Sequence, residues 1–417
     1  MRHKNRINIY LQYLLVFFVI LDSRSVFAHI YDSNLGKFLS VFIILDLLAI
    51  FIINFNKKLK RNTILFLLAY FSYISIFFLL GVQNSRLGFL SSFFVIFPLM
   101  FLMFSVYDKE QIQNLLKAYI NVMFVIALVS LVFYIGGSLL KLVEPNITLN
   151  IDWGGLKSIY GYYYWHFDTQ TTVIFGQVLL RNTSIFVEGP MFALHLILAM
   201  GFALFYKKNM FNKYTIVFGL SILSSLSLTG MLISLFLILY RFLFYNKNKN
   251  IRFLKIMVIF FVLIIGLFLF YDKTETRSYN IRSDDFRAGY LAWKEHKIMG
   301  NGFMNNELAV SFMSDFRSYN TGLSSSLVIV LVQGGIYLAL FYLFPFVIGF
   351  LKYLLHGKNL YLLELFLVQF SLIFMNAYQY TSIMMLLLAF DYYFLLYSNK
   401  NEELKNFFLG DGLHETI

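Results

Sequence analysis

Long apolar runs, separated by short charged segments, dominate the pattern of this chain. Many have the roughly 17–25 residues that cross the hydrocarbon core of a bilayer as a helix. They are continuous rather than alternating, and only helices and closed barrels satisfy their backbone groups in lipid. The pattern predicts an all-α, polytopic integral membrane protein, one membrane domain over 1–417, with about twelve transmembrane helices. The expected spans are 8–27, 37–55, 63–81, 87–106, 118–137, 189–206, 214–226, 230–246, 256–271, 323–351, 360–375 and 378–397.

Two of these boundaries depend on small residues. The apolar stretch from Tyr214 to Leu243 is too long for one helix, and we expect it to break at 227–230, where the sequence reads Ser-Leu-Thr-Gly. The stretch 323–351 contains Gly334-Gly335. It is therefore either one tilted span or a short re-entrant piece followed by a full span.

Charged residues orient the spans. With the N-terminus inside, the inner segments collect most of the lysines and arginines, as short cytoplasmic loops do. Examples are Lys57, Lys58, Lys60 and Arg61 in one loop, and Lys247, Lys249, Arg252 and Lys255 in another. This bias predicts that both termini are cytoplasmic, and it accounts for most of the net charge of +12. We expect no nucleic-acid partner, because the chain has no basic soluble domain to bind one.

Composition excludes several kinds of chemistry. Hydrophobic residues make up 59% of the chain and charged residues only 13%, which leaves too little charge for a soluble surface. Without cysteine there are no disulfides, thiolate metal sites or cysteine nucleophiles. No glycine-rich nucleotide loop and no convincing metal-ligand spacing occur, so we expect neither a cofactor nor a metal. The first span lacks a clear cleavage site and reads as a helix rather than a signal peptide.

Two long outer loops, 138–188 and 272–322, interrupt the short connections. They contain all three tryptophans: Trp153 and Trp165 in the first, and Trp293 in the second. An interfacial aromatic belt is one explanation. The alternative is a platform on which sugar rings stack. Belt residues should occur at both membrane faces, and no tryptophan is expected at the inner one, which favours the ligand.

The second outer loop carries balanced charges around a predicted helix, 284–297. Phe286, Tyr290 and Trp293 recur there at helical spacing. Arginine forks bind phosphate oxygens bidentately, so this loop is a candidate anion site, although solvated or ion-paired arginines are the alternative. The paired aspartates weakly resemble a metal and nucleotide-sugar motif. The candidate substrate-binding residues in this loop are Arg282, Asp284, Asp285, Arg287, Trp293 and Arg317.

Few ionisable residues fall at membrane depth, where such residues are functional candidates. They are Asp46, Glu188, His195, Glu364 and Asp391. Glu364 and Asp391 lie near predicted inner helix ends, from which they can reach the interface. Glu188 begins a helix with Pro190 at an early position, and Arg181 precedes it. A helix N-terminus also attracts anions, so Glu188 is either catalytic or a carboxylate that stabilises the helix dipole.

Several segments resemble the bacterial O-antigen and capsule polymerases and ligases. The segment 181–190, Arg-Asn-Thr-Ser-Ile-Phe-Val-Glu-Gly-Pro, is similar to the family's arginine–aromatic–glutamate–proline signature, with Gly189 inserted before the proline. The segment 225–230 resembles its threonine–glycine turn, with Leu228 in place of an arginine. In the second loop, Arg287 and the aromatic helix precede 298–302, Ile-Met-Gly-Asn-Gly, and then 333–336, Gln-Gly-Gly-Ile. The resemblance covers about 180–350 and the overall topology.

The resemblance implies a glycosyltransferase of the cytoplasmic (inner) membrane. It would join undecaprenyl-diphosphate-linked oligosaccharide repeat units, as donor and acceptor, on the outer face. Arg181 and Arg287 would bind diphosphate, and Glu188 would act as base or orient Arg181. Membrane lipid, a chain-length regulator and a flippase are the implied partners. The ligase histidine is missing from 317–324, which favours the repeat-unit polymerase (the Wzy type) over a ligase; a lipid-linked oligosaccharide flippase or other transporter is the alternative from another class.

Overall fold

The computed structural model describes residues 2–31, 34–55, 59–81, 84–152, 156–174, 176–206, 210–245, 277–317, 321–356 and 360–397. The described chain is mostly helical. It divides into two compact units, one built from residues up to Val122 and from Asp284 onward, the other from Met123 to Ser283. The boundaries fall within helices α6 (Lys109–Phe133) and α11 (Arg277–Glu295). Each unit is described separately below.

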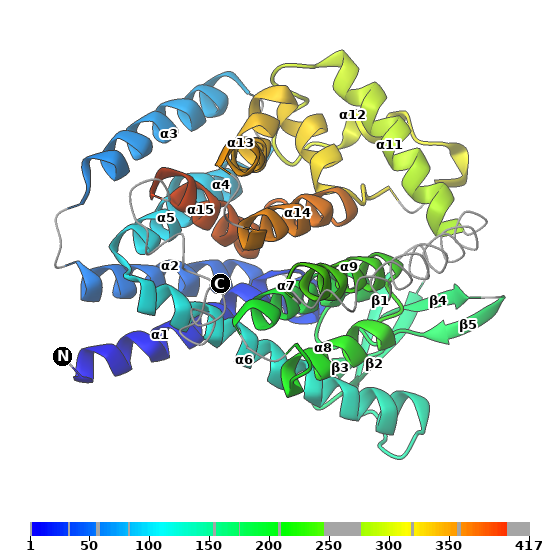
Figure 1. Ribbon diagram of the computed structural model, residues 1–417. Coiled ribbons are helices and arrows are strands. Elements are labelled where there is room, and N and C mark those ends of the chain that lie inside the picture. The colour runs from blue at the N-terminus through cyan, green and yellow to red at the C-terminus, as the bar shows by residue number, and fades with distance from the viewer. Residues whose placement is uncertain are drawn as a thin grey trace. The chain divides into compact units, whose positions relative to one another are not determined.

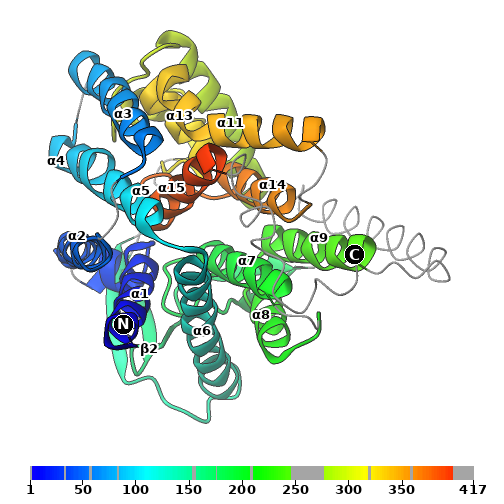
Figure 2. The ribbon, with the colours of Figure 1, turned by 60° about the vertical axis from the view of Figure 1, so that its left-hand side comes forward.

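The first unit is a bundle of helices (Figures 1 and 2). Neighbouring pairs pack closely, namely α1 on α2, α5 on α15 and α13 on α14. Its centre is rich in aromatic rings, including Phe97, Phe341 and Tyr392, whose centroids lie 5.1–6.1 Å apart. Besides parts of α6 and α11, the unit contains α1 (Arg2–Asp22), α2 (Leu35–Asn54), α3 (Arg61–Leu80), α4 (Arg86–Phe89), α5 (Phe97–Val106), α12 (Glu307–Ser311), α13 (Ser326–His356), α14 (Leu360–Met375) and α15 (Ser382–Tyr397).

The second unit combines a helical group with two small sheets. Helices α7 (Gly189–Tyr206), α8 (Lys213–Ser224) and α9 (Leu228–Tyr245) pack on one another. Strands β1 (Ile147–Asp152), β2 (Leu156–Tyr162) and β3 (His166–Phe167) form an antiparallel sheet in that order. Strands β4 (Thr171–Ile174) and β5 (Gln177–Leu180) form a separate hairpin, the pair of arrows beside the sheet in Figure 1.

These strands lie in the first outer loop, where no strand was predicted. The signal is present in the sequence. Residues 147–152 read Ile-Thr-Leu-Asn-Ile-Asp, which alternates apolar and polar positions as a half-buried strand does. The β4–β5 hairpin turns at Gly176, whose φ of +75° favours glycine. The all-α prediction therefore holds for the helical part of the chain and fails in this loop.

The predicted helices are present wherever the structure describes them. Six are long and apolar enough to cross a membrane: Asn5–Asp22, Leu35–Asn54, Arg61–Leu80, Arg86–Val106, Lys109–Leu139 and Ser326–Leu351. Shorter apolar helices are α7, α8, α9 and α15. The predicted span 256–271 and the basic cluster 247–255 lie outside the described residues. This architecture is consistent with a helical membrane protein, while the count of about twelve spans stays a prediction.

Exposed side chains agree with a lipid environment. One face of α3 exposes Leu65, Leu68, Leu79 and Leu80, two of them by more than 70%. Contiguous apolar surface of this kind is rare on soluble monomers, where water would oppose it. In lipid, the same surface carries no penalty.

Both small-residue breaks occur. Helix α8 ends at Ser224 and α9 begins at Leu228, with Leu226 at φ +49° in the turn, slightly before the expected break. Helix α13 is broken at Gly335, where φ is +59° and ψ is −162°. The break does not decide between a tilted span and a re-entrant piece.

A loop from the second predicted outer segment fills the break in α13. The carbonyl groups of Val332 and Gln333 accept hydrogen bonds from the amides of Asn301 (2.8 Å) and Gly302 (2.9 Å). In return, the Ile336 amide donates to Lys297 O at 2.8 Å. Together with the Tyr337 amide, which donates to Ile298 O, four backbone groups at the break therefore find partners in 297–302, as groups buried away from water require.

Gly335→Ala should destabilise the protein by roughly 1–3 kcal/mol, because a Cβ there would clash with the Ile298 carbonyl at an unfavourable positive φ. Gly219→Ala is the matched control, since a methyl on that α8 glycine meets nothing within 4 Å. The thermal midpoint of detergent-purified protein, followed by circular dichroism, provides the measurement. Equal midpoints for the two variants would show that the break tolerates a side chain.

Candidate functional site

In the second unit, Arg181 joins two of the segments that carry the family resemblance. Its Nε donates to Ser225 O at 2.9 Å and its Nη2 donates to Leu226 O at 3.2 Å. Both carbonyls follow the end of α8, where an arginine side chain satisfies groups that have no helical partner. The signature segment and the α8–α9 turn therefore meet at one guanidinium group.

Gly189 explains how this junction closes. A Cβ at this position would lie 2.7 Å from Arg181 Nε and 2.9 Å from Ser225 O. Both distances are too short for a real side chain, so only glycine allows the start of α7 to approach Arg181 so closely. The extra glycine in the signature is thus a packing requirement in this chain.

Gln170 links the same arginine to the helix N-terminus. Its Oε1 accepts from Arg181 Nη1 at 3.3 Å and from the Gly189 amide at 3.2 Å. Sequence reasoning did not single out Gln170. Its position, directly before a strand in a loop, gives no local signal.

Electrostatics distinguish this centre from an ordinary buried ion pair. Burial lowers the pKa of Arg181 to about 10, Glu188 opposes that shift, and Arg282 adds to it. Arg282 is thus close enough to repel Arg181. The charges of two arginines and one glutamate therefore act on one another at this centre.

A network of buried polar side chains is hydrogen-bonded to the signature segment. The Ser130 hydroxyl donates to Asn182 Oδ1 at 2.6 Å, and Asn182 Nδ2 donates to Ser224 Oγ at 3.0 Å. His166 Nε2 lies 3.1 Å from Asp168 Oδ1, and the His166 side chain is fully buried. His166 lies within the tyrosine-rich run, and neither it nor Asp168 was predicted as a functional residue. Their burial indicates that they position the segment rather than touch a substrate.

In the first unit, two consecutive aspartates fix a loop to α11. Asp284 accepts hydrogen bonds from Ser314 Oγ at 2.7 Å and from the Ser314 amide at 3.1 Å. Asp285 accepts from Arg317 Nη1 at 2.8 Å and from the Ser324 amide at 3.0 Å. The side chains of both aspartates and of Arg317 are almost fully buried. For Arg317 and Asp285 this geometry matches the ion-paired alternative, and a ligand-binding role stays a prediction.

Arg287 is the accessible member of this cluster. Its Nη2 donates to Asp284 Oδ1 at 2.7 Å and to Phe312 O at 2.6 Å. Its Nε also donates to Asp284, at 3.1 Å. Half of the side chain is exposed, and Nη1 makes no hydrogen bond to the described residues. Arg287 is therefore held in a fixed orientation with two N–H groups available.

The predicted helix 284–297 is confirmed as part of α11, and its aromatic face is the exposed one. Phe286 is 42% exposed and Tyr290 is 58% exposed, with Trp293 half-buried beside Tyr290 at 5.9 Å between rings. The buried face carries Ala288, Gly289 and Ala292. A Cβ on Gly289 would clash with Val328, so small residues allow α11 to approach α13 closely.

The first loop also presents exposed aromatic rings. Between β2 and β3, Tyr163, Tyr164 and Trp165 are 39–55% exposed. Tyr163 and Tyr164 both have positive φ, of 49° and 63°, which is costly for bulky residues. Trp153 lies outside the described residues. Arg181 and Arg287 belong to different units, so their action as a pair stays a prediction.

Three of the ionisable residues at membrane depth are buried. Asp46 is 5% exposed, His195 is fully buried with its ring stacked 4.8 Å from Phe186, and Asp391 is fully buried. Asp391 thus does not reach an interface, contrary to expectation, because α14, α13 and α5 surround the middle of α15. The Glu364 side chain lies outside the described residues.

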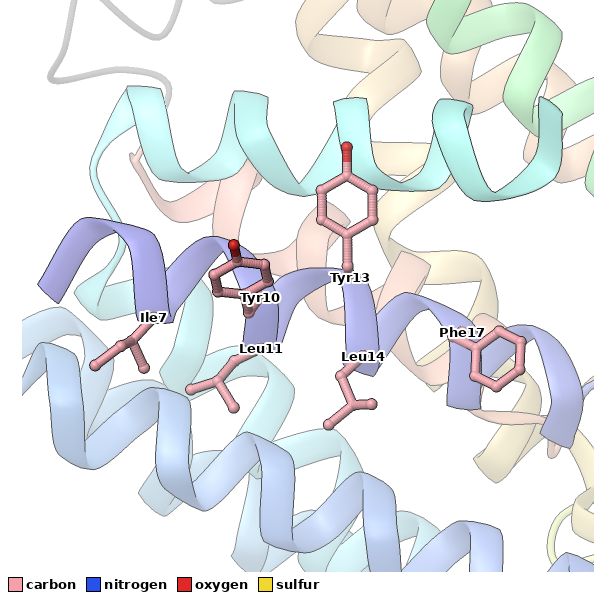
Figure 3. Close-up of a pocket in the computed structure, with 6 residues that line it drawn as sticks. All are labelled: Ile7, Tyr10, Leu11, Tyr13, Leu14 and Phe17. Atoms are coloured by element: carbon pink, nitrogen blue, oxygen red, sulfur yellow. The ribbon is translucent and has the colours of Figure 1, made fainter. Parts of the chain in front are cut away.

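A surface groove of about 460 Å³ runs along α1, and none of the residues that line it is charged (Figure 3). Its polar groups are the hydroxyls of Tyr10 and Tyr13, and Tyr13 accepts a hydrogen bond from Asn121 at 2.6 Å. The other lining residues are Ile7, Leu11, Leu14 and Phe17. Within the described chain, no three histidine, aspartate or glutamate side chains come together as a metal site.

No protein-family model, no curated protein and no solved structure matches this chain. What the two charged centres can do therefore follows from their own residues. One is a junction at a helix N-terminus, built around the buried Arg181. The other is a neutral, hydrogen-bonded scaffold that presents one arginine beside exposed aromatic rings.

Asp284→Asn should destabilise the protein at neutral pH by about 1.5–3 kcal/mol, the usual value for hydrogen bonds to a charged group. Burial alone would raise the pKa of Asp284, but hydrogen bonds from Ser314 and Arg287 outweigh it and lower the pKa. The stabilisation is therefore present above the ordinary aspartate pKa of about 3.9 and is lost as pH falls through the lower folded value.

Chemical denaturation of wild type and Asp284→Asn between pH 3 and 7 measures this difference. The gap should close toward the acidic end. Glu295→Gln, which removes an exposed carboxylate from the same helix, is the matched control and should leave stability nearly unchanged. A gap that is constant with pH would rule out the ionised Asp284 as its source.

Proposed function

We propose that this protein is a polymerase of O-antigen or capsular polysaccharide, acting on undecaprenyl-diphosphate-linked repeat units at the outer face of the cytoplasmic membrane. The observation that carries the proposal is Arg287, whose oriented and half-exposed guanidinium group lies on the same helix face as Phe286 and Tyr290. A guanidinium fork suits diphosphate oxygens, and exposed aromatic rings suit the C–H faces of sugars.

The arrangement of the resembling segments supports the same proposal. They associate as two pairs: Arg181 with the α8–α9 turn, and 297–302 with the break at Gly335. Each pair is far apart in sequence yet hydrogen-bonded. The family-like order of the segments is therefore accompanied by direct contacts.

The proposed reaction is a displacement at an anomeric carbon. The acceptor hydroxyl forms the new C–O bond, and the donor's bond to diphosphate breaks, with the electron pair leaving on the diphosphate. Arginines stabilise the charge that grows on the departing group. Glu188, half-buried at the start of α7, takes the acceptor proton or orients Arg181. The sugar–diphosphate bond supplies the driving force, so no nucleotide is required.

Arg287→Ala should lower polymer formation by about 10²-fold, the usual cost of removing one donor to developing charge. Arg287→Lys should restore little polymer formation, because lysine lacks the planar fork and would lose the paired hydrogen bonds to Asp284 that orient the side chain. Purified protein in liposomes, supplied with lipid-linked repeat units and assayed for chain length on gels, provides the measurement.

Lys294→Ala is the matched control, since Lys294 is an exposed base on the same helix. Its polymer should be normal. Arg181→Ala should behave like Arg287→Ala if both bind diphosphate. Wild-type chain lengths from Arg287→Ala would refute the proposed role.

The reaction also requires the loop 272–322 to face outward, within reach of an outer-leaflet donor. In the proposed topology of about twelve spans, with both termini cytoplasmic, Ser311 faces outward and Phe211 faces the cytoplasm. Both residues are exposed. The chain has no cysteine, so Ser311→Cys and Phe211→Cys can be labelled separately in spheroplasts with a membrane-impermeant maleimide. Position 311 should react and position 211 should not; the reverse pattern would place Arg287 on the wrong face.

A further inference from the structure

Asp391 lies in the middle of α15 and is fully buried. It faces Gln369 of α14, which is 1% exposed. Gln369 Nε2 donates to Asp391 Oδ1 at 3.2 Å. This is the hydrogen bond that joins the two side chains.

The other oxygen of each group has no partner among the described residues. Asp391 Oδ2 and Gln369 Oε1 are both buried, and no hydrogen bond joins either of them to the described part of the chain. If Asp391 is ionised, both atoms are acceptors only, so neither can satisfy the other. An ionised carboxylate with one hydrogen bond is also far too costly at membrane depth. A cation shared between the two oxygens resolves both problems.

The surrounding elements supply no such cation among the described residues. Helix α5 and the π-helix before it, Leu90–Ile96, contain no titratable side chain. The hydroxyl of Tyr342 on α13 donates to Gln379 O. The carboxylate of Asp22, at the end of α1, accepts a hydrogen bond from the amide of Ser382 at the start of α15.

The basic side chains near α15 contact groups other than Asp391. Arg24 approaches Ala377 O at 3.4 Å, and Lys60 lies over the Tyr397 ring at the other end of the helix. The hydroxyls of Tyr378 and Tyr392 are close enough to sense the charge of Asp391. The Tyr392 hydroxyl donates to Phe341 O at 2.7 Å, whereas the Tyr378 hydroxyl has no hydrogen-bond partner among the described residues.

We propose that Asp391 is a proton-binding site, at which Oδ2–H donates to Gln369 Oε1 while Gln369 Nε2–H donates to Asp391 Oδ1. A carboxylic acid and a primary amide form such a two-hydrogen-bond ring when both are neutral. The bound proton satisfies both orphan oxygens and removes the buried charge. It also joins α14 to α15 at two points instead of one, so loss of the proton would weaken this helix pair. The site is independent of the polymerase chemistry.

The first test is the pH dependence of stability. The folded chain keeps the proton, whereas an unfolded chain releases it above the ordinary aspartate pKa of about 3.9. Wild type should therefore lose stability, relative to Asp391→Asn, by up to tenfold in the folded-to-unfolded ratio per pH unit above that value. Asparagine mimics the neutral acid, because its amide can donate to Gln369 Oε1. Glu295→Gln should show no such divergence from wild type.

The second test detects the proton directly. Infrared spectra of wild type should contain a protonated carboxylic-acid C=O band that shifts in D₂O and is lost in Asp391→Asn. If that variant does not fold, Gln369→Leu keeps the acid and should move the band by removing its acceptor. Tyr378→Phe should leave the band unchanged.

Two results would overturn the proposal. Absence of the band, with destabilisation by Tyr378→Phe, would mean that an ionised Asp391 accepts from Tyr378. Absence of the band, with stability that rises on adding Na⁺ or K⁺ against choline, would mean that a metal cation occupies the gap. The polymerase assay measures chain length and neither stability nor the infrared band. Failure of the proton-site proposal is therefore distinguishable from failure of the proposed function.

Discussion

Burial of polar groups away from water is the constraint on which the rest of this structure depends. A broken helix, a guanidinium group or a carboxylate in such a place needs hydrogen-bond partners from polar groups of the same chain. Neither lipid nor apolar side chains can supply them. At Gly335, the segment 297–302 supplies the missing backbone partners. At Arg181, two carbonyls after α8 and the Gln170 side chain do so. Both solutions join segments that are distant in sequence, so satisfying buried groups also brings together the segments that carry the family resemblance.

The two centres meet this constraint differently, and the difference bears on chemistry. Around α11, two aspartates balance two arginines, and the cluster is stable without a ligand. Around Arg181, burial lowers the pKa of the guanidinium group, Glu188 opposes that shift, and Arg282 adds to it. The first centre is preorganised by its own hydrogen bonds. In the proposed function, a diphosphate group at the second centre would relieve the repulsion between its two arginines.

The sequence predicted the helices, the break within 214–243 and the helix in the second loop, because apolar periodicity and small residues report directly on local structure. It also predicted catalytic roles for Arg181, Glu188 and Arg287 and substrate binding by Asp284 and Asp285, and those roles stay predictions. It could not predict which face of α11 is buried. Phe286, Tyr290 and Trp293 form the more hydrophobic stripe, but close approach to Val328 demands the small residues instead. The contacts of Gln170, His166 and Asp391 were equally inaccessible, since each depends on a partner from another element.

Helix α11 buries its small residues and exposes its aromatic ones. Packing of the helix and the chemistry of its exposed face therefore depend on different residues. Ala288, Gly289 and Ala292 hold the helix in place, while Phe286 and Tyr290 on the other face are exposed. These two exposed side chains can therefore be exchanged at little cost to folding. In the proposed function, a fixed helix with exchangeable exposed residues would let single substitutions change the preference for a sugar without rebuilding the packing beneath it.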